Sequence, residues 1–231
     1  MFEIDTHKRV MVEVLLDIYR DSLLRNLLGF KGGTMAYLFY ELPRMSVDLD
    51  FDLIDVTKKE EVFEKLKQIL SKYKVIEEVD KKNCLFFLVD YGFDQRKLKI
   101  EVSKRGTGEV FERKNYLGMA FLVMKKEAMV SGKMAAALNR KRLANRDIFD
   151  TWFFLKNNYG FDEDRLEELT GMKAEEVLKK LVKLVLGLKN NQMLFGLGDL
   201  LDNSKKDFVR SGRLKEELLT YLKMYNSPIL R

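Results

Sequence analysis

The segment from Val47 to Ile54 constrains the fold most strongly, because apolar and acidic residues alternate along it in strict period two. Such alternation predicts a β-strand whose two faces lie in different surroundings. Leu49, Phe51 and Leu53 would form the buried face, and the acidic residues would share the other face. The segment therefore predicts a strand with one buried face and one acidic face.

The acidic face of this strand is a candidate metal site. Asp48 and Asp50 would project together, about 7 Å apart along the strand, and Asp52 extends the row. Neighbouring carboxylates repel one another, and Mg²⁺, held by one or two carboxylates plus substrate phosphates, is a natural counter-charge. A solvated acidic edge strand would show the same pattern, so the alternation alone leaves both interpretations open.

A second alternating strand, predicted over residues 97–103, carries Glu101 among apolar residues. If this strand pairs beside Asp48 and Asp50, Glu101 completes a three-carboxylate cluster that could hold two metal ions. A single charged residue on a half-exposed strand is the alternative. The amino-acid composition supports carboxylate ligands, because the chain has one histidine and one cysteine. A site rich in histidine or cysteine is thereby excluded, and so is an internal disulfide, whereas Mg²⁺ or Mn²⁺ is favoured.

The single histidine and the single cysteine have no predicted part in the site. His7 lies on a polar turn near the terminus, and we expect it at the surface. Cys84 begins an apolar strand, and we expect an inert buried thiol.

The periodicity predicts an α+β protein whose first half is a mixed sheet with flanking helices and whose second half is mostly helical. The glycines in 105–108 mark the candidate boundary, giving domains 1–108 and 109–231. A capping box at Thr57 would open one helix of the first half. Strands are expected near 28–31, 47–54, 74–79, 84–91, 97–103 and 119–124, and helices near 5–27, 35–42, 57–73, 125–142, 145–158, 162–170, 173–187 and 213–225.

The charge is unevenly distributed along the chain. Residues 1–104 hold 18 Lys and Arg against 19 Asp and Glu, and residues 105–231 hold 24 against 17. The basic second half suits an anionic partner such as nucleic acid or nucleotide phosphates, although a lysine-rich solvated surface would look the same. No apolar run approaches the ~20 residues that cross a membrane, and the acidic start is unlike a signal peptide. We therefore expect a cytoplasmic protein.

The turn Gly32-Gly33-Thr34 lies between a predicted strand and a predicted helix. Glycine lets the backbone approach a phosphate, and amides at a helix N-terminus bind anions. Most such turns are only turns, so the turn by itself is weak evidence.

Together these motifs resemble the nucleotidyltransferase superfamily that includes DNA polymerase beta, and more narrowly the AbiEii-type toxin nucleotidyltransferases. The resemblance covers roughly residues 28–160. It rests on Lys31-Gly-Gly-Thr34, on Arg44-Met-Ser46-x-Asp48-Leu-Asp50-Phe51, on Gly132-Lys133-Met-Ala-Ala-Ala-Leu138 with Arg140, and on Asn145-Arg146-Asp147-Ile-Phe-Asp150.

The resemblance implies a role for each motif residue. Asp48 and Asp50 would bind Mg²⁺, Lys133 would contact phosphates, and Asp147 would act in catalysis or substrate positioning. Glu101 stands where the superfamily usually has Asp. The residues that would bind the NTP are Lys31, Gly32, Gly33, Thr34 and Ser46.

The charged residues of the two helical motifs can also be explained without the family resemblance. Lys133 and Arg140 are seven residues apart and share one helix face, and Asp147 and Asp150 share a face of the next helix. An interhelical set of salt bridges would explain all four. A catalytic role requires them to face the Asp48 cluster.

The expected activity is Mg²⁺-dependent transfer of a nucleoside monophosphate from an NTP to an acceptor hydroxyl, with release of pyrophosphate. For the resembling toxins the acceptor is typically tRNA, and an antitoxin is the cognate partner. A small molecule such as an aminoglycoside, or a protein hydroxyl, is the alternative acceptor. A non-catalytic nucleotide- or RNA-binding module on the same fold is the alternative of another class.

Overall fold

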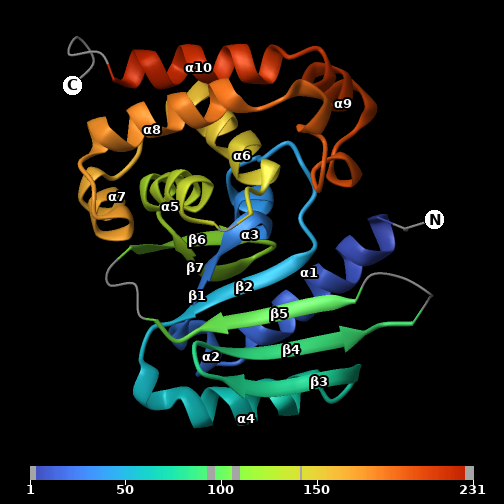
Figure 1. The fold of residues 1–231 in the computed structure, drawn as a ribbon. Coiled ribbons are helices and arrows are strands. Elements are labelled where there is room, and N and C mark those ends of the chain that lie inside the picture. The colour runs from blue at the N-terminus through green and yellow to red at the C-terminus, as the bar shows by residue number, and fades with distance from the viewer. Residues whose placement is uncertain (1–3, 93–96, 106–109, 141, 227–231) are drawn as a thin grey trace. The chain divides into compact units, whose positions relative to one another are not determined.

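The computed structural model describes residues 4–92, 97–105, 110–140 and 142–226. The chain divides into two compact units, residues 1–41 with 45–125 and residues 42–44 with 126–231. Unit 1 is built on a sheet and unit 2 on helices, as expected of an α+β protein (Figure 1). In the described part of the chain, no helix is long and apolar enough to span a membrane.

Unit 1 contains a mixed seven-stranded sheet in the order β3-β4-β5-β2-β1-β7-β6, in which β2/β5 and β1/β7 are parallel and the other pairs antiparallel. Its elements are α1 (Ile4–Arg20), α2 (Leu24–Leu27), β1 (Leu28–Lys31), α3 (Gly32–Phe39), β2 (Asp48–Leu53), α4 (Lys59–Leu70), β3 (Lys74–Lys81), β4 (Cys84–Asp90), β5 (Leu98–Ser103), β6 (Phe111–Tyr116) and β7 (Met119–Met124).

One face of this sheet is the hydrophobic core of unit 1. Leu49 and Phe51 on β2 are completely buried, as the alternation predicts. Phe51 contacts Tyr19 of α1, and Phe87 of β4 contacts Phe63 of α4, so α1 and α4 cover the same face. Because side chains alternate along a strand, Asp48 and Asp50 lie on the opposite face.

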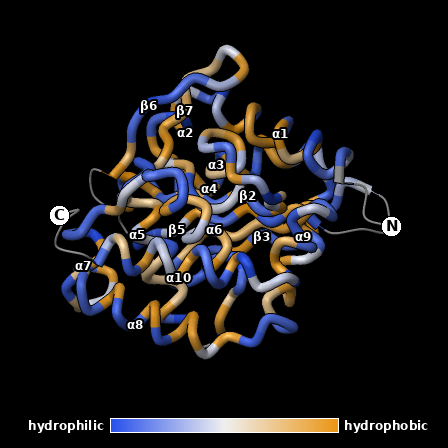
Figure 2. The backbone as a smooth tube through the Cα atoms, turned by 90° about the horizontal axis from the view of Figure 1, so that it is seen from above, coloured by the Kyte–Doolittle hydropathy of each residue, from blue (hydrophilic) through white to orange (hydrophobic). Residues whose placement is uncertain are grey.

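Unit 2 packs its helices around a second core. Its helices are α5 (Lys126–Asn139), α6 (Asn145–Lys156), α7 (Glu163–Thr170), α8 (Ala174–Gly187), α9 (Asn203–Arg210) and α10 (Arg213–Tyr225). Helix α5 packs against α6, α7 and α8, and α10 packs against α6 and α8. The colour changes along α8 show hydrophobic residues recurring between hydrophilic ones, which gives the helix one apolar side (Figure 2).

The observed division differs from the boundary predicted at 105–108, of which 106–108 lie outside the described residues. Strand β6 was not predicted, yet it pairs with β7, and β7 pairs with β1. The sheet therefore continues to Met124, and the units divide after Lys125. The segment 42–44, with flanks in unit 1, belongs to unit 2.

Three further expectations are corrected. The first helix ends at Arg20, because the Asp21 carboxylate accepts hydrogen bonds from the N–H groups of Leu23 and Leu24. The predicted cap at Thr57 is wrong: Asp55 accepts from the Thr57 N–H and caps a 3₁₀ turn, Val56–Lys58, ahead of α4. Helix α9 was not predicted, because its polar eight residues lack an apolar repeat.

His7 and Cys84 are also placed differently from expectation. His7 is completely buried: its Nε2–H donates to the Val47 carbonyl at 2.9 Å, and Nδ1 accepts from the Tyr91 hydroxyl at 2.7 Å. Cys84 is half-buried, so its thiol is accessible rather than enclosed. Burial and the charge of Glu101 raise the pKa of this thiol above its ordinary value.

Candidate active site

The predicted site residues fall into two sets, one in each compact unit, and each set is described by itself. Asp48, Asp50 and Glu101 belong to unit 1, whereas Lys133 and Asp147 belong to unit 2. That the two sets meet in one active site stays a prediction.

Asp48 and Asp50 lie on β2, the central strand of the sheet, and Glu101 lies on the neighbouring strand β5. Strand β2 is bordered by β5 on one side and by β1 on the other, so the alternative of a solvated acidic edge strand is wrong. Asp50 lies opposite Glu101 in the parallel register, as the cluster hypothesis requires, and opposite Lys31 in the antiparallel register. Asp48 and Asp50 are half-buried, which leaves their carboxylates open to a ligand.

Lys99, which belongs to the predicted strand of Glu101 but had no predicted role, lies among these carboxylates. It is opposite Asp48 in the register, and its Nζ is 3.9 Å from Asp48 Oδ2 and 3.5 Å from Glu101 Oε2. The sequence contained a signal for this position: Lys99 lies two residues before Glu101 on an alternating strand, so the two side chains share a face. Glu101 is therefore partly neutralised by a cation from its own strand.

Burial and neighbouring charge set the titration of this cluster. Burial, followed by the charges of Asp48 and Glu101, raises the pKa of Asp50, although Lys99 and Lys31 act in the opposite direction. Burial alone would lower the pKa of Lys99, but Asp50, Asp48 and Glu101 together raise it. The cluster therefore has a carboxyl group whose pKa is above its ordinary value beside an ammonium group whose pKa is also raised.

Asp52 does not extend the carboxylate row into solvent. It is completely buried and forms an ion pair with Lys31. Asp52 Oδ2 has no hydrogen-bond partner among the described residues. In the structure, Lys31 thus neutralises a buried carboxylate, and the binding of NTP by Lys31 stays a prediction.

The predicted glycine turn opens helix α3 directly beside Asp50. Gly32 has a φ of +81°, and a Cβ on it would lie 2.6 Å from Asp50 Oδ2. The N-terminal amides of α3, at Gly32, Gly33 and Thr34, thus begin where β1 meets β2. This is an arrangement that can bind an anion next to carboxylates.

Thr34 and Ser46 frame the start of β2. Thr34 is buried, and its hydroxyl donates to the carbonyl oxygen of Asp48, which ties α3 to that strand. Ser46 is half-buried, two residues before Asp48. Phosphate binding by either side chain stays a prediction.

The donor set fits a hard cation. Asp48 and Asp50 supply oxygen atoms, which Mg²⁺ and Mn²⁺ prefer. In the described part of the chain, no group of three or more His, Cys, Asp or Glu residues is arranged to hold a metal ion. The three-ligand set with Glu101 is thus not assembled, and a ligand role for Glu101 stays a prediction. Two carboxylates with substrate phosphates meet the ordinary needs of Mg²⁺.

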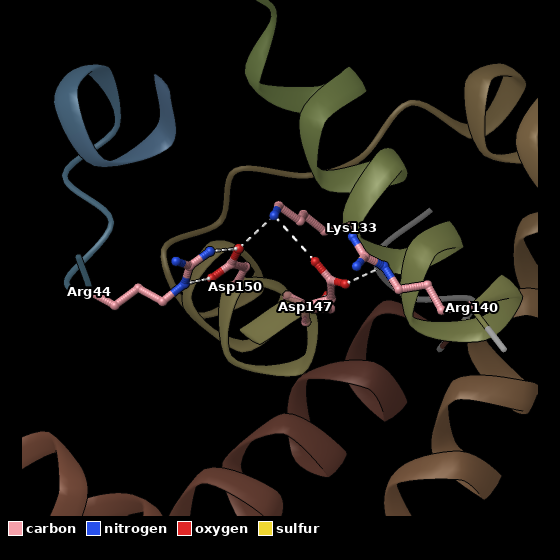
Figure 3. A network of polar contacts seen from close by, with 6 residues as sticks. Arg44, Lys133, Arg140, Asp147 and Asp150 are labelled. Atoms are coloured by element: carbon pink, nitrogen blue, oxygen red, sulfur yellow. Dashed lines mark hydrogen bonds and ion pairs between the residues drawn. The ribbon is translucent and has the colours of Figure 1, made fainter. Parts of the chain in front are cut away.

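In unit 2, five charged residues form one network (Figure 3). The Arg44 guanidinium donates two hydrogen bonds to the carboxylate of Asp150, at 2.5 and 2.6 Å. Lys133 Nζ lies 2.8 Å from Asp150 and 3.3 Å from Asp147. Arg140 Nε is 3.0 Å from Asp147 Oδ2, an ion pair without hydrogen-bond geometry. Lys133 of α5 thus bridges to Asp147 and Asp150 of α6, as the salt-bridge interpretation expects, and Arg140 follows the end of α5.

The network is buried apart from Arg140, which is exposed. Arg44 was visible in the sequence only as part of a motif. The side chains of Arg44 and Asp150 are 2% and 0% exposed. Burial alone would raise the pKa of Asp150, but Lys133 and Arg44 lower it below its ordinary value. Catalysis by Asp147 and phosphate contact by Lys133 stay predictions, because the structure shows both residues bound to partners within unit 2.

Comparisons with known proteins identify the family and the fold. The family model for the nucleotidyl transferase AbiEii toxin of type IV toxin–antitoxin systems matches residues 14–210. The fold is similar to the crystal structure of JHP933 from Helicobacter pylori, with a TM-score of 0.67 and 21% identity over 97% of this chain and 92% of that chain. It is also similar to a candidate nucleotidyltransferase from H. pylori, with a TM-score of 0.62 and 22% identity over 96% and 93% of the two chains. No curated protein matches the chain. Since the family model covers most of its length, the chain belongs to the AbiEii family of nucleotidyltransferase toxins.

Proposed function

We propose that this protein transfers a nucleoside monophosphate from an NTP to a hydroxyl group of an RNA acceptor, with tRNA as the expected acceptor. The acceptor oxygen forms a bond to the α-phosphorus, the bond to the pyrophosphate leaving group breaks, and the hydroxyl proton is released. The family supports NTP use and an antitoxin partner. The basic second half supports an anionic acceptor over a cationic small molecule.

One observation carries the proposal: Asp48 and Asp50 lie on the central strand, beside the glycine that opens α3. The α3 amides would bind the triphosphate, and the two carboxylates would hold Mg²⁺. Bound there, Mg²⁺ would neutralise the charge that develops on the phosphates. Other buried aspartates, such as Asp52, form an ion pair with a cationic side chain and are therefore not available to bind a metal ion.

The residues of the chain contribute mainly by positioning and electrostatics. Lys99 opposes the rise that burial causes in the pKa of Asp50, and Thr34 fixes Asp48 relative to α3. A non-catalytic binding module has no use for two half-buried carboxylates beside an anion site, so the arrangement favours an enzyme.

The test uses Asp48→Asn, which removes one charge and keeps the size of the side chain. We expect it to lose transfer of label from α-³²P-labelled NTPs to total tRNA, while the circular dichroism spectrum stays unchanged. Asp199→Asn, at an exposed position of unit 2, is the matched control and should keep full activity. Full activity of Asp48→Asn would refute the proposal, and label on an aminoglycoside or a protein instead of tRNA would refute the acceptor.

A further inference from the structure

A cavity of about 390 Å³ lies in unit 1 beside the carboxylate cluster. Its walls come from β1, from β5 with the residues that follow it, and from the β3–β4 hairpin. The charged side chains that line it are Lys31, Lys81, Lys82, Arg105 and Glu101. Four cations against one carboxylate make it a concave site for an anion.

The sheet register places this cavity on the catalytic face and on one side of the carboxylates. Ser103, in the cavity wall, lies opposite Asp52 in β2 and opposite Cys84 in β4. Helix α3 is tied to the other end of β2, through Thr34 and Asp48. Along β2, Asp50 therefore lies between the α3 end and the cavity end.

The four cations differ in how far carboxylates neutralise them. Lys31 pairs with Asp52, and Lys81 lies 3.4 Å from Glu77. Lys82 and Arg105 are exposed, and within the described residues neither forms an ion pair. A guanidinium and an ammonium group in a concave wall, without carboxylates to neutralise them, can bind phosphate oxygens.

We propose that this cavity binds a phosphodiester of the acceptor RNA, adjacent to the hydroxyl that receives the nucleotide. The proposal rests on the proposed function and names where its acceptor binds. A free triphosphate offers the same chemistry, but the α3 amides already provide an anion site beside Asp50, on its Asp48 side. Nucleotide and acceptor would thus approach Asp50 from two sides.

The first test measures binding of a fluorescein-labelled single-stranded 12-mer oligoribonucleotide by anisotropy, without NTP. The double variant Lys82→Ala/Arg105→Ala should raise the Kd about tenfold. It should also reduce the magnitude of the slope of log K against log salt concentration by about 1.4, because each phosphate that is no longer neutralised contributes ~0.7. Arg25→Ala/Lys125→Ala is the matched control, because it removes one exposed arginine and one exposed lysine from unit 1 and neither pairs with a described carboxylate. Equal weakening in both double variants would overturn the proposal.

The second test uses Cys84, the only cysteine of the chain, as a reporter inside the cavity. The 12-mer should slow maleimide labelling of Cys84 at least several-fold, and ATP alone should not. Protection by ATP but not by the 12-mer would assign the cavity to the triphosphate and overturn the proposal. Neither readout needs nucleotide transfer, so a protein that binds the 12-mer here but transfers nothing refutes the proposed function and not this site.

Discussion

Gly32 and Asp50 are so close that a Cβ on Gly32 would lie 2.6 Å from Asp50 Oδ2. The two residues are close for two reasons. Lys31 lies opposite Asp50 in the register of β1 and β2, and the chain then turns into α3 with a φ of +81° at Gly32. The anion-binding end of the helix and a candidate metal ligand are thereby adjacent.

Gly32→Ala should destabilise the protein by about 2–4 kcal/mol and abolish nucleotide transfer. The left-handed backbone costs an alanine about 1–2 kcal/mol, and the clash with Asp50 adds overpacking strain. Gly118→Ala is the control, because Gly118 has a φ of +77° but open space around it, so only the backbone cost applies. Urea unfolding measures the stability of both variants, and an equal loss of stability in the two would show that the contact with Asp50 is unimportant.

Asp50→Asn should stabilise the folded protein at pH 7 while removing activity. Burial raises the folded-state pKa of Asp50 above its ordinary value of 3.8, so ionisation costs stability as pH rises through the folded pKa. The variant should therefore melt at a higher temperature than the parent protein at pH 7. The difference should vanish below pH 3.8, where Asp50 is protonated in both states. A lower melting temperature at pH 7 would contradict the assignment.

Lys99→Gln should move the acid limb of the pH–rate profile to higher pH. Lys99 opposes the rise in the pKa of Asp50, so its removal raises that pKa further, and a larger fraction of Asp50 is protonated and inactive at any given pH on the acid limb. The measurement is kcat/KM for NTP from pH 5 to 8. Lys97→Gln, just ahead of β5 and paired with Asp90, should leave the limb in place.

Arg44→Met should cost about 3 kcal/mol of stability. It leaves the buried Asp150 carboxylate without its two-bond partner, and breaking one side of a buried pair is strongly destabilising. Arg213→Met, whose exposed side chain is 3.8 Å from Glu217, should cost less than about 1 kcal/mol. Urea unfolding followed by circular dichroism compares them, and a neutral Arg44→Met would show that Lys133 alone satisfies Asp150.

Lys133→Met should raise the KM for NTP more than Arg44→Met does. Both variants remove one cation from the same buried network, so both lose stability by the same mechanism. Only Lys133 is predicted to contact the phosphates, so its loss alone should weaken NTP binding. Equal KM values in the two folded variants would leave Lys133 with a structural role only.

The local pattern predicted much of this protein. The alternation around Asp48 and Asp50 identified a strand with a buried and an acidic face, because side-chain direction in a strand has period two whatever lies beside it. The glycines before α3 marked the turn for a similarly local reason. Strand β6 lacks a clear alternation and α9 an apolar repeat, so neither was visible in the sequence.

Only the tertiary structure decided what surrounds these elements. The central place of β2 depends on pairing with β5, about fifty residues away, and that register puts Lys99 among the carboxylates. The burial of His7 and the bond from Arg44 to Asp150 likewise join segments distant in sequence. The sequence by itself determined which side chains share a face, because periodicity is local. Which charges neutralise them depends on strand pairing and packing between distant segments, and no local pattern contains that information.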